Sequence, residues 1–364
     1  MDKGRVVTYL NKNTGIRILL LWLVVSMFMM SCELDQHSEQ QYNENILTIG
    51  EYLKKNQQDY SMFSRILIAG DLLITMGGYN PHGDGYTLFL PTNEAVIQYI
   101  RENKDYANFE EMLQDTSFTQ KLARYHVVNN MLRTHDFPHG ALIDETLSGD
   151  RLIIGITTEE DHSFYKVNNS FPIMESNLEM TNGYIHVISG VIQQGKNTGY
   201  DWLQQQNEYS ILSKAMELTG IKQRLWIDEY TLLIEHDSIY QRAGIMNVQD
   251  LIARIATPGM ALTNRSNSFY RFVGFHILGN EYYLNDFPYG KRNYTTLGST
   301  QLTINVGLDI HINPGVAEYG ISISEKGDTS IIDYISPVWE KSNIVTRSGP
   351  VHSLSEVLFF EPLP

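Results

Sequence analysis

Apolar residues recur along the chain at two spacings, which predict helices in some segments and strands in others. Within residues 46–76 they return every three or four positions, the period of one helix face. Residues 202–225 repeat this helical texture. Within residues 301–335 apolar and polar positions alternate, as expected of antiparallel strands with one solvated face. These segments together predict a fold of the α+β class.

The apolar run at residues 86–90 predicts a strand, and the residues after it predict the start of a helix. Thr92 follows Pro91, and its hydroxyl is expected to accept a free backbone N–H of the first helical turn. Glu94 in that turn complements the helix dipole. The carboxylate of Glu94 is therefore explained by helix formation, without a catalytic role.

A second strand is predicted near the end of this region. Asn182 and Gly183 form a dipeptide typical of tight turns, and residues 184–192 alternate behind it. We expect both turn residues to matter for stability through turn geometry, and not for activity.

Three segments of the first half return in the second half in the same order. The matched pairs are residues 86–96 with 230–240, 124–128 with 274–278, and 182–192 with 348–358. A repetition of this length predicts two copies of one domain, at residues 46–196 and 199–364. The interval from His126 to His186 is 60 residues, against 76 from His276 to His352, so the second copy is expected to have longer loops.

The first copy resembles the fasciclin family of extracellular adhesion domains. The segment TLFLPTNEAV is similar to the first family motif, NGYIHVISGVI to the second, and Tyr125-His126 to the tyrosine-histidine pair between them. The resemblance implies helices packed on a wedge-shaped β-sandwich in each of two tandem domains. It assigns structural motif positions to Thr87, Pro91, Thr92, Asn93, Glu94, Asn182, Gly183, His186, Gly349 and His352.

The second copy departs further from the family motifs. Residues 235–239 (EHDSI) replace Pro-Thr-Asn-Glu-Ala, Phe275 replaces Tyr125, and Ser348-Gly349 replaces Asn-Gly. The resemblance ties integrin contact in animal members to an Asp-Ile pair before the second motif. Here the aligned pairs are Asn177-Leu178 and Asn343-Ile344, which lack the acid. An integrin-type mechanism is therefore not supported.

The N-terminus predicts export and lipid attachment. Basic residues precede a 13-residue apolar run at 18–30, which fits a signal peptide and is shorter than the roughly 20 residues of a membrane span. Cys32, the single cysteine, follows directly. We interpret residues 1–31 as a lipoprotein signal peptide of bacterial type, Cys32 as the acylated residue, and 32–45 as a flexible acidic tether. A noncleaved anchor helix with an incidental cysteine is the alternative.

Charge narrows the range of partners. The chain holds 27 basic and 42 acidic residues and carries a formal charge of −15. Nucleic-acid binding normally needs a basic surface that neutralises phosphates, and neither half offers one. Nucleic acid is therefore excluded as a partner, and anionic polysaccharides are disfavoured.

No residue pattern predicts catalysis or a bound metal. The recurring histidines lack the cysteines or close His spacing of a zinc site, so His186 is interpreted as a core imidazole bonded to backbone. There is no nucleophile elbow, dinucleotide fingerprint or phosphate-binding loop. The sequence predicts no enzyme, no cofactor and no metal.

Aromatic residues supply the candidate binding positions. The chain has 22 tyrosines, and flat amphipathic rings serve sugar and protein interfaces equally well. Half-buried strands also favour tyrosine, which is the alternative explanation. Candidate binding positions from the tyrosine-histidine regions and the longer second loop are Tyr125, His126, Phe275, His276, Tyr282, Tyr283, Tyr289 and Tyr294.

Taken together, these features predict a noncatalytic adhesion or binding lipoprotein, anchored at the outer membrane and exposed at the bacterial surface, that recognises a protein or glycan. One alternative is an accessory subunit of an outer-membrane polysaccharide or nutrient-uptake complex, docked on its transporter. Another is a carbohydrate-active enzyme with two carboxylates that the sequence does not single out.

Overall fold

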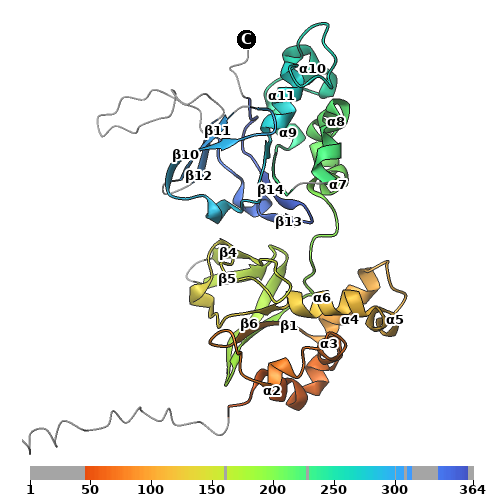
Figure 1. Ribbon diagram of the computed structural model, residues 1–364, viewed down its shortest axis with the longest axis vertical. Helices are drawn as coiled ribbons and strands as arrows, with labels where there is room; N and C mark the ends of the chain where they lie inside the picture. Colours follow the sequence, from red (N-terminus) through yellow and green to blue (C-terminus); the bar gives the residue numbers. More distant parts are fainter. Residues whose placement is uncertain are drawn as a thin grey trace, which may run out of the picture. The chain divides into compact units, whose positions relative to one another are not determined.

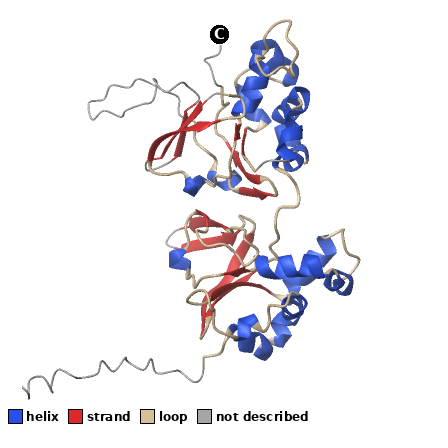
Figure 2. Ribbon diagram, viewed as in Figure 1, coloured by secondary structure: helices blue, strands red, loops and turns tan. Residues whose placement is uncertain are grey.

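The computed structural model describes residues 46–159, 162–226, 229–299, 301–306, 310–313 and 335–359. Residues 47 onward form one compact unit. The predicted signal peptide, Cys32 and the acidic tether lie outside the described residues, as does much of the alternating segment at 301–335. In each repeat the helices gather against one side of the strands (Figure 1, Figure 2).

Four of the five α-helices of the first repeat begin with a side-chain cap, and α3 (Gln57–Ala69) is the exception. The helices are α2 (Ile49–Lys55), α3, α4 (Asn93–Glu102), α5 (Phe109–Gln114) and α6 (Thr116–Tyr125), with 3-10 turns η1 (Thr75–Gly77) and η2 (Thr134–Asp136). The Thr92 hydroxyl accepts a hydrogen bond from the Ala95 N–H at 3.2 Å, and Glu94 lies in the first turn of α4. The predicted helix start is therefore confirmed.

The strands of the first repeat form one seven-stranded sheet in the order β2-β1-β7-β6-β5-β4-β3. They are β1 (Tyr86–Pro91), β2 (Val127–Val128), β3 (Gly140–Ala141), β4 (Ile153–Glu159), β5 (His162–Val167), β6 (Phe171–Met180) and β7 (Gly183–Ile188). The two motif strands, β1 and β7, are neighbours and pair in parallel, and the other pairs are antiparallel.

Strand β7 is buried along its whole length, which corrects the alternation expected from its sequence. Its neighbour β1 shows the reason, because its two faces belong to different cores. Leu88 packs with the helices, whereas Phe89 packs with Ile154 and Val167 from the far end of the same sheet. The sheet curls over itself, so both faces of its central strands are covered.

The second repeat holds the same kinds of element. Its helices are α7 (Gly199–Gln204), α8 (Ser210–Thr219), α9 (Asp237–Arg242), α10 (Val248–Ile255) and α11 (Ser268–Phe275), with 3-10 turns η3 (Asn207–Tyr209), η4 (Ile221–Trp226), η5 (Leu284–Asp286) and η6 (Trp339–Lys341). Its strands are β8 (Thr231–Ile234), β9 (Ile277–Leu278), β10 (Gly290–Thr295), β11 (Gln301–Val306), β12 (Ile310–Asn313), β13 (Ile344–Thr346) and β14 (Gly349–Ser353).

These strands form two sheets, in the orders β13-β14-β8-β9 and β10-β11-β12. Strand β8 pairs in parallel with β14, as β1 pairs with β7. The α+β class is confirmed for the described residues.

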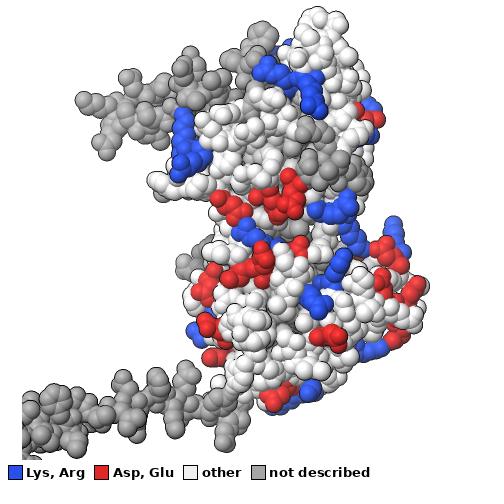
Figure 3. Space-filling view, viewed as in Figure 1, with Lys and Arg blue, Asp and Glu red and all other residues white. Residues whose placement is uncertain are grey.

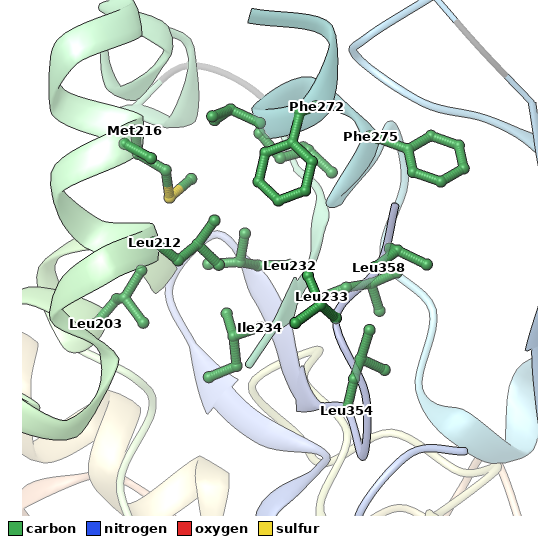
Figure 4. Packing of buried hydrophobic residues seen from close by; sticks show 14 of the residues in the cluster. Leu203, Leu212, Met216, Leu232, Leu233, Ile234, Phe272, Phe275, Leu354 and Leu358 are labelled. Atoms are coloured by element: carbon green, nitrogen blue, oxygen red, sulfur yellow. The ribbon is translucent and has the colours of Figure 1, made fainter. Parts of the chain in front are cut away.

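The core of the second repeat closes around β8 (Figure 4). Three helices and the segment after β14 direct apolar side chains onto this strand, and the residues shown are Leu203, Leu212, Met216, Leu232, Leu233, Ile234, Phe272, Phe275, Leu354 and Leu358. Each fully buried side chain of this size contributes about 1.5 to 3 kcal/mol relative to an exposed one. The C-terminal segment is therefore an integral part of this core.

The predicted turn at Asn182 and Gly183 joins β6 to β7, and its stabilising contacts are long-range. The Asn182 amide accepts from the Ile49 N–H at 2.9 Å and donates to the carbonyls of Met76 and Gly78 at 2.9 and 2.6 Å. Gly183 stands opposite Tyr86 in the β1–β7 pair, and a Cβ there would collide with the Tyr86 carbonyl oxygen. The second repeat has the same close approach.

Replacing Gly183 by alanine is expected to lower the free energy of unfolding by about 2 to 3 kcal/mol. The added Cβ would have to displace the backbone of β1, which cannot move without disturbing both cores. The matched control is Gly77→Ala, where no atom lies within 4 Å of the added Cβ, and a change within about 0.5 kcal/mol is expected. Urea denaturation followed by circular dichroism measures both. Equal effects at the two positions would contradict this account.

Specific contacts join the two repeats. The Asn285 side chain accepts from the Ala141 N–H and donates to the Ala141 carbonyl, both at 2.8 Å, as a peptide group of a neighbouring strand would. Arg151 forms an ion pair with Asp286, with its Nη1 at 2.8 and 2.9 Å from the two carboxylate oxygens. The Arg151 guanidinium also lies over the ring of Tyr283 at 5.3 Å. These contacts hold β3 of the first repeat against η5 of the second.

Candidate functional site

Two of the recurring histidines make the same hydrogen bonds in both repeats. The Nδ1 atoms of His186 and His352 accept from the backbone N–H of Asn177 and Asn343, at 3.3 and 3.0 Å. Their Nε2 atoms face the carbonyls of Leu132 and Tyr282, at 2.9 and 2.8 Å. Each ring is therefore a neutral imidazole that donates through Nε2. The interpretation of His186 as a backbone-bonded core residue is confirmed.

Burial determines the protonation of these rings. Removal from water disfavours the charged imidazolium and lowers the pKa of His186, of His352 and of the similarly buried His126 to about 4. All three are uncharged at neutral pH and already bonded within the protein. Their ring nitrogens hold neighbouring segments together through these hydrogen bonds.

The other pair of histidines differs between the repeats. His126 and His276 both donate from Nδ1 to a helix carbonyl at 2.8 Å. The Nε2 of His126 accepts from the Ile192 N–H, whereas that of His276 faces the carboxylate of Glu235 at 2.9 Å. Glu235 stands at the end of β8, where the first repeat has Pro91. The side chains of His276 and Glu235 are both completely buried.

Most of the predicted binding residues lie in the core. The side chains of Tyr125, His126, Phe275 and His276 are 0 % exposed, and Tyr283 is 3 % exposed. The Tyr125 hydroxyl accepts from the Asn168 amide at 3.0 Å, and burial raises the pKa of both tyrosines above its usual value. A partner cannot reach these side chains at the surface of the folded protein.

Three of the predicted tyrosines remain near the surface of the second repeat. Tyr282 and Tyr294 are half-buried and pack with Phe287, with ring centroids 5.2 to 5.5 Å apart. Tyr289 is 81 % exposed, next to the edge strand β10 with its exposed Lys291 and Arg292. Of the predicted aromatic surface, only Tyr289 and the exposed edges of the Tyr282 and Tyr294 rings therefore remain accessible.

A cleft of about 750 Å³ lies between the repeats, and sequence reasoning did not identify it. The first repeat contributes the end of α4, the β5–β6 turn and the loop after β7, and the second contributes α7, η3, η6 and β13. Four of its lining residues are aromatic, namely Tyr99, Phe171, Trp202 and Tyr209. These residues come from separate segments and form no sequence motif, so their proximity could not be predicted from the sequence.

Hydrogen bonds position the polar wall of this cleft. Asn168 and Asn169 adopt positive φ angles of 50° and 55° in the β5–β6 turn, a conformation that asparagine tolerates better than most residues. The Asn169 amide donates across to the Ser342 carbonyl of the second repeat at 3.0 Å. Lys196 pairs with Asp105 at the cleft edge. The turn thus shapes the cleft and connects its two walls.

Neither a metal-binding cluster nor a membrane-spanning helix is found in the described part of the chain. No three His, Cys, Asp or Glu side chains there are grouped so that they could hold a metal ion. None of the helices described is long and apolar enough to cross a membrane. On the face shown in Figure 3, acidic and basic side chains are interspersed in small groups.

Comparison with known proteins identifies the first repeat. Residues 58–194 match the model of the fasciclin domain. The chain is 30% identical over 139 residues to Stabilin-2 of Rattus norvegicus, which is 38% of this chain and 8% of that protein. It is 30% identical over 137 residues to Periostin of Homo sapiens, which is 37% of this chain and 15% of that protein. Residues 58–194 therefore match the fasciclin domain, as the motifs of the first repeat predicted.

Among solved structures, the chain is similar to a FAS1 domain pair from the insect cell adhesion molecule fasciclin I. The alignment covers 82% of this chain and 96% of that structure, with 14% sequence identity and a TM-score of 0.36. Both curated relatives are far longer than this chain, which spans less than a sixth of either one.

Proposed function

We propose that this protein is an exported, lipid-anchored surface protein of bacterial type that binds a protein or glycan partner and catalyses no reaction. The observation that supports this proposal is the match of residues 58–194 to the fasciclin domain, in which motif side chains bond to the backbone. Thr87, for example, donates to the Asn130 carbonyl at 2.7 Å and accepts from the Leu132 N–H at 2.8 Å. A partner would therefore be recognised by exposed surface residues or by the cleft between the repeats.

The second repeat, at residues 199–364, belongs in this proposal as a divergent fasciclin-like domain. Thr231 repeats the bonds of Thr87, with 2.8 Å to the Asn280 carbonyl and 2.8 Å to the Tyr282 N–H. Gly349 approaches the Tyr230 carbonyl as Gly183 approaches that of Tyr86. These shared backbone constraints support a common fold better than the degraded motif sequence does.

Membrane attachment is proposed to use Cys32 after removal of residues 1–31. Cys32→Ala is the direct test, since it removes the sole thiol of the chain. We expect the wild-type protein in the membrane fraction of the expressing bacterium and the variant in the soluble fraction or uncleaved. Equal membrane retention of both would assign anchoring to another segment.

The binding function itself is tested on intact cells that carry the full-length protein. A membrane-impermeant crosslinker is expected to join the chain to an envelope protein if the partner is a protein. If the partner is a glycan, cells that carry the chain should retain labelled polysaccharide after washing, and cells without the chain should not. Steady release of cleaved polysaccharide products would overturn the noncatalytic assignment. Stable copurification with an outer-membrane porin would instead indicate an accessory subunit of an uptake complex.

A further inference from the structure

We propose that the cleft between the two repeats is the binding site for a neutral oligosaccharide, with Trp202 as its main stacking platform. The inference rests on the proposed function, because it names the ligand class and the place of recognition. The cleft has a volume of about 750 Å³, which lies within the usual range for ligand sites, roughly 300 to 1,000 Å³. Such sites are often found at domain interfaces.

The aromatic rings of the cleft are held in place by their neighbours. Trp202 is half-buried and packs against Tyr209, with ring centroids 5.9 Å apart. The Tyr99 hydroxyl donates to Gln193 at 2.8 Å and accepts from the Asn103 amide at 3.1 Å. Phe171 lies so close over Gly190 that any Cβ there would collide with its ring. Rings fixed before binding lose little entropy when a ligand arrives.

Half-buried rings and hydrogen-bond donors suit a sugar. The flat face of an aromatic ring covers the C–H face of a pyranose, while its edge remains in water. Two uncharged side-chain donors in the cleft have no hydrogen-bond partner among the described residues, namely the indole N–H of Trp202 and the NH₂ group of Gln193. Sugar hydroxyl oxygens can accept from both.

The charges and the scarcity of aliphatic side chains narrow the ligand class. The lining holds three lysines and four carboxylates, so positive and negative charge nearly cancel, and one such pair is already formed by Lys196 and Asp105. A strongly charged ligand would find no complementary field. A peptide anchors best through apolar side chains in apolar pockets, but only Val191, Ile344 and Val345 offer aliphatic surface here. An uncharged oligosaccharide fits this lining better.

The test uses the full-length chain in a detergent whose headgroup is not a sugar. Maltohexaose, cellohexaose and mannohexaose are the neutral probes, with hexagalacturonate as the anionic probe and an alanine–leucine hexapeptide as the peptide probe. Isothermal titration calorimetry is expected to show one-to-one binding of at least one neutral hexaose. Trp202→Ala should weaken this binding by about tenfold or more, and Trp202→Phe by less, because it keeps a ring.

Tyr79→Ala is the matched control, since it removes an exposed aromatic ring outside the cleft, and it should leave affinity within about twofold. Tyr289→Ala tests the competing aromatic surface beside β10. Thermal unfolding of each variant shows whether a loss of binding reflects a loss of folding, and Trp202→Phe gives a second reading where the alanine variant unfolds.

The outcomes separate this inference from the proposed function. No binding of any neutral hexaose, preferred binding of the anionic or peptide probe, or undiminished binding by Trp202→Ala each overturns the cleft as a neutral-oligosaccharide site. Binding that depends on Tyr289 moves the site to the edge of β10 and leaves the proposed binding function standing. Conversion of a bound hexaose to shorter products overturns the noncatalytic function itself.

Discussion

Lowering the pH from 7.5 to 5 is expected to reduce the free energy of unfolding by about 2 kcal/mol for each of His126, His186 and His352. Burial lowers the pKa of each ring from 6.5 to about 4 in the folded protein. The unfolded chain therefore binds a proton below about pH 6.5 that the folded chain does not bind until about pH 4.

The sign follows from this difference. Above pH 6.5 the rings are neutral in both states, so their full contribution to stability is present. As the pH falls from 6.5 toward 4, protonation favours the unfolded chain and stability decreases. Three such rings together would remove about 6 kcal/mol at pH 5, comparable to the total stability of many domains, which is roughly 5 to 15 kcal/mol.

Urea denaturation at half-unit intervals between pH 7.5 and 5 measures this loss. His186→Gln should reduce the pH dependence by about one third, whatever its effect on absolute stability. His135→Asn is the control, because the His135 side chain is 70% exposed and its removal should leave the slope unchanged. A pH-independent stability over this range would show that the three rings are not buried as described.

Glu235→Ala is expected to lower the free energy of unfolding by about 3 to 5 kcal/mol, because it removes one partner of a buried, hydrogen-bonded pair. Glu235 is 0% exposed and faces His276 at 2.9 Å. The carboxylate also accepts from the Tyr240 hydroxyl and from the Leu358 N–H, both at 2.8 Å. Without it, three buried polar groups lose a partner at once, and the C-terminal segment loses its attachment to β8.

The matched control is Glu110→Ala, which breaks the exposed ion pair with Arg65. That pair has a shorter contact, 2.6 Å, but its side chains are 64 and 48% exposed, so a loss below about 1 kcal/mol is expected. Chemical denaturation at pH 7.5 compares the two variants. Similar losses would mean that burial does not govern the strength of these pairs.

Local signals in the sequence were sufficient to predict the fold class and several element boundaries, and they also predict the repeat. The cap at Thr92 depends on residues three positions apart, and the two-copy architecture depends on motifs that recur in order. The fasciclin resemblance rested on motif residues such as Thr87 and Asn182, which the backbone contacts of the fold require. Such features are readable because few residues, close in sequence or strongly constrained, produce them.

Other assignments failed because burial is a property of the assembled fold. Tyr125 and Tyr283 are of a residue type that suits a binding surface. Packing within the sheet and between the repeats nevertheless buries both side chains. Likewise, the carboxylate of Asp237 in the first turn of α9 accepts from the N–H groups of Ser210 and Ile211 at the start of α8. Neither outcome follows from neighbours along the chain.

The sequence alone therefore predicted two related repeats and an exported anchor and defined the α+β class and an acidic chain, since repetition, charge and hydrophobic period are local or additive properties. Tertiary structure decided which residues face solvent. It also brings Glu235 into contact with His276 and places Tyr99, Phe171 and Trp202 in the lining of one cleft. Those relations join segments 40 to more than 100 residues apart, and only the closing of the sheet and the docking of the repeats brings them within contact distance.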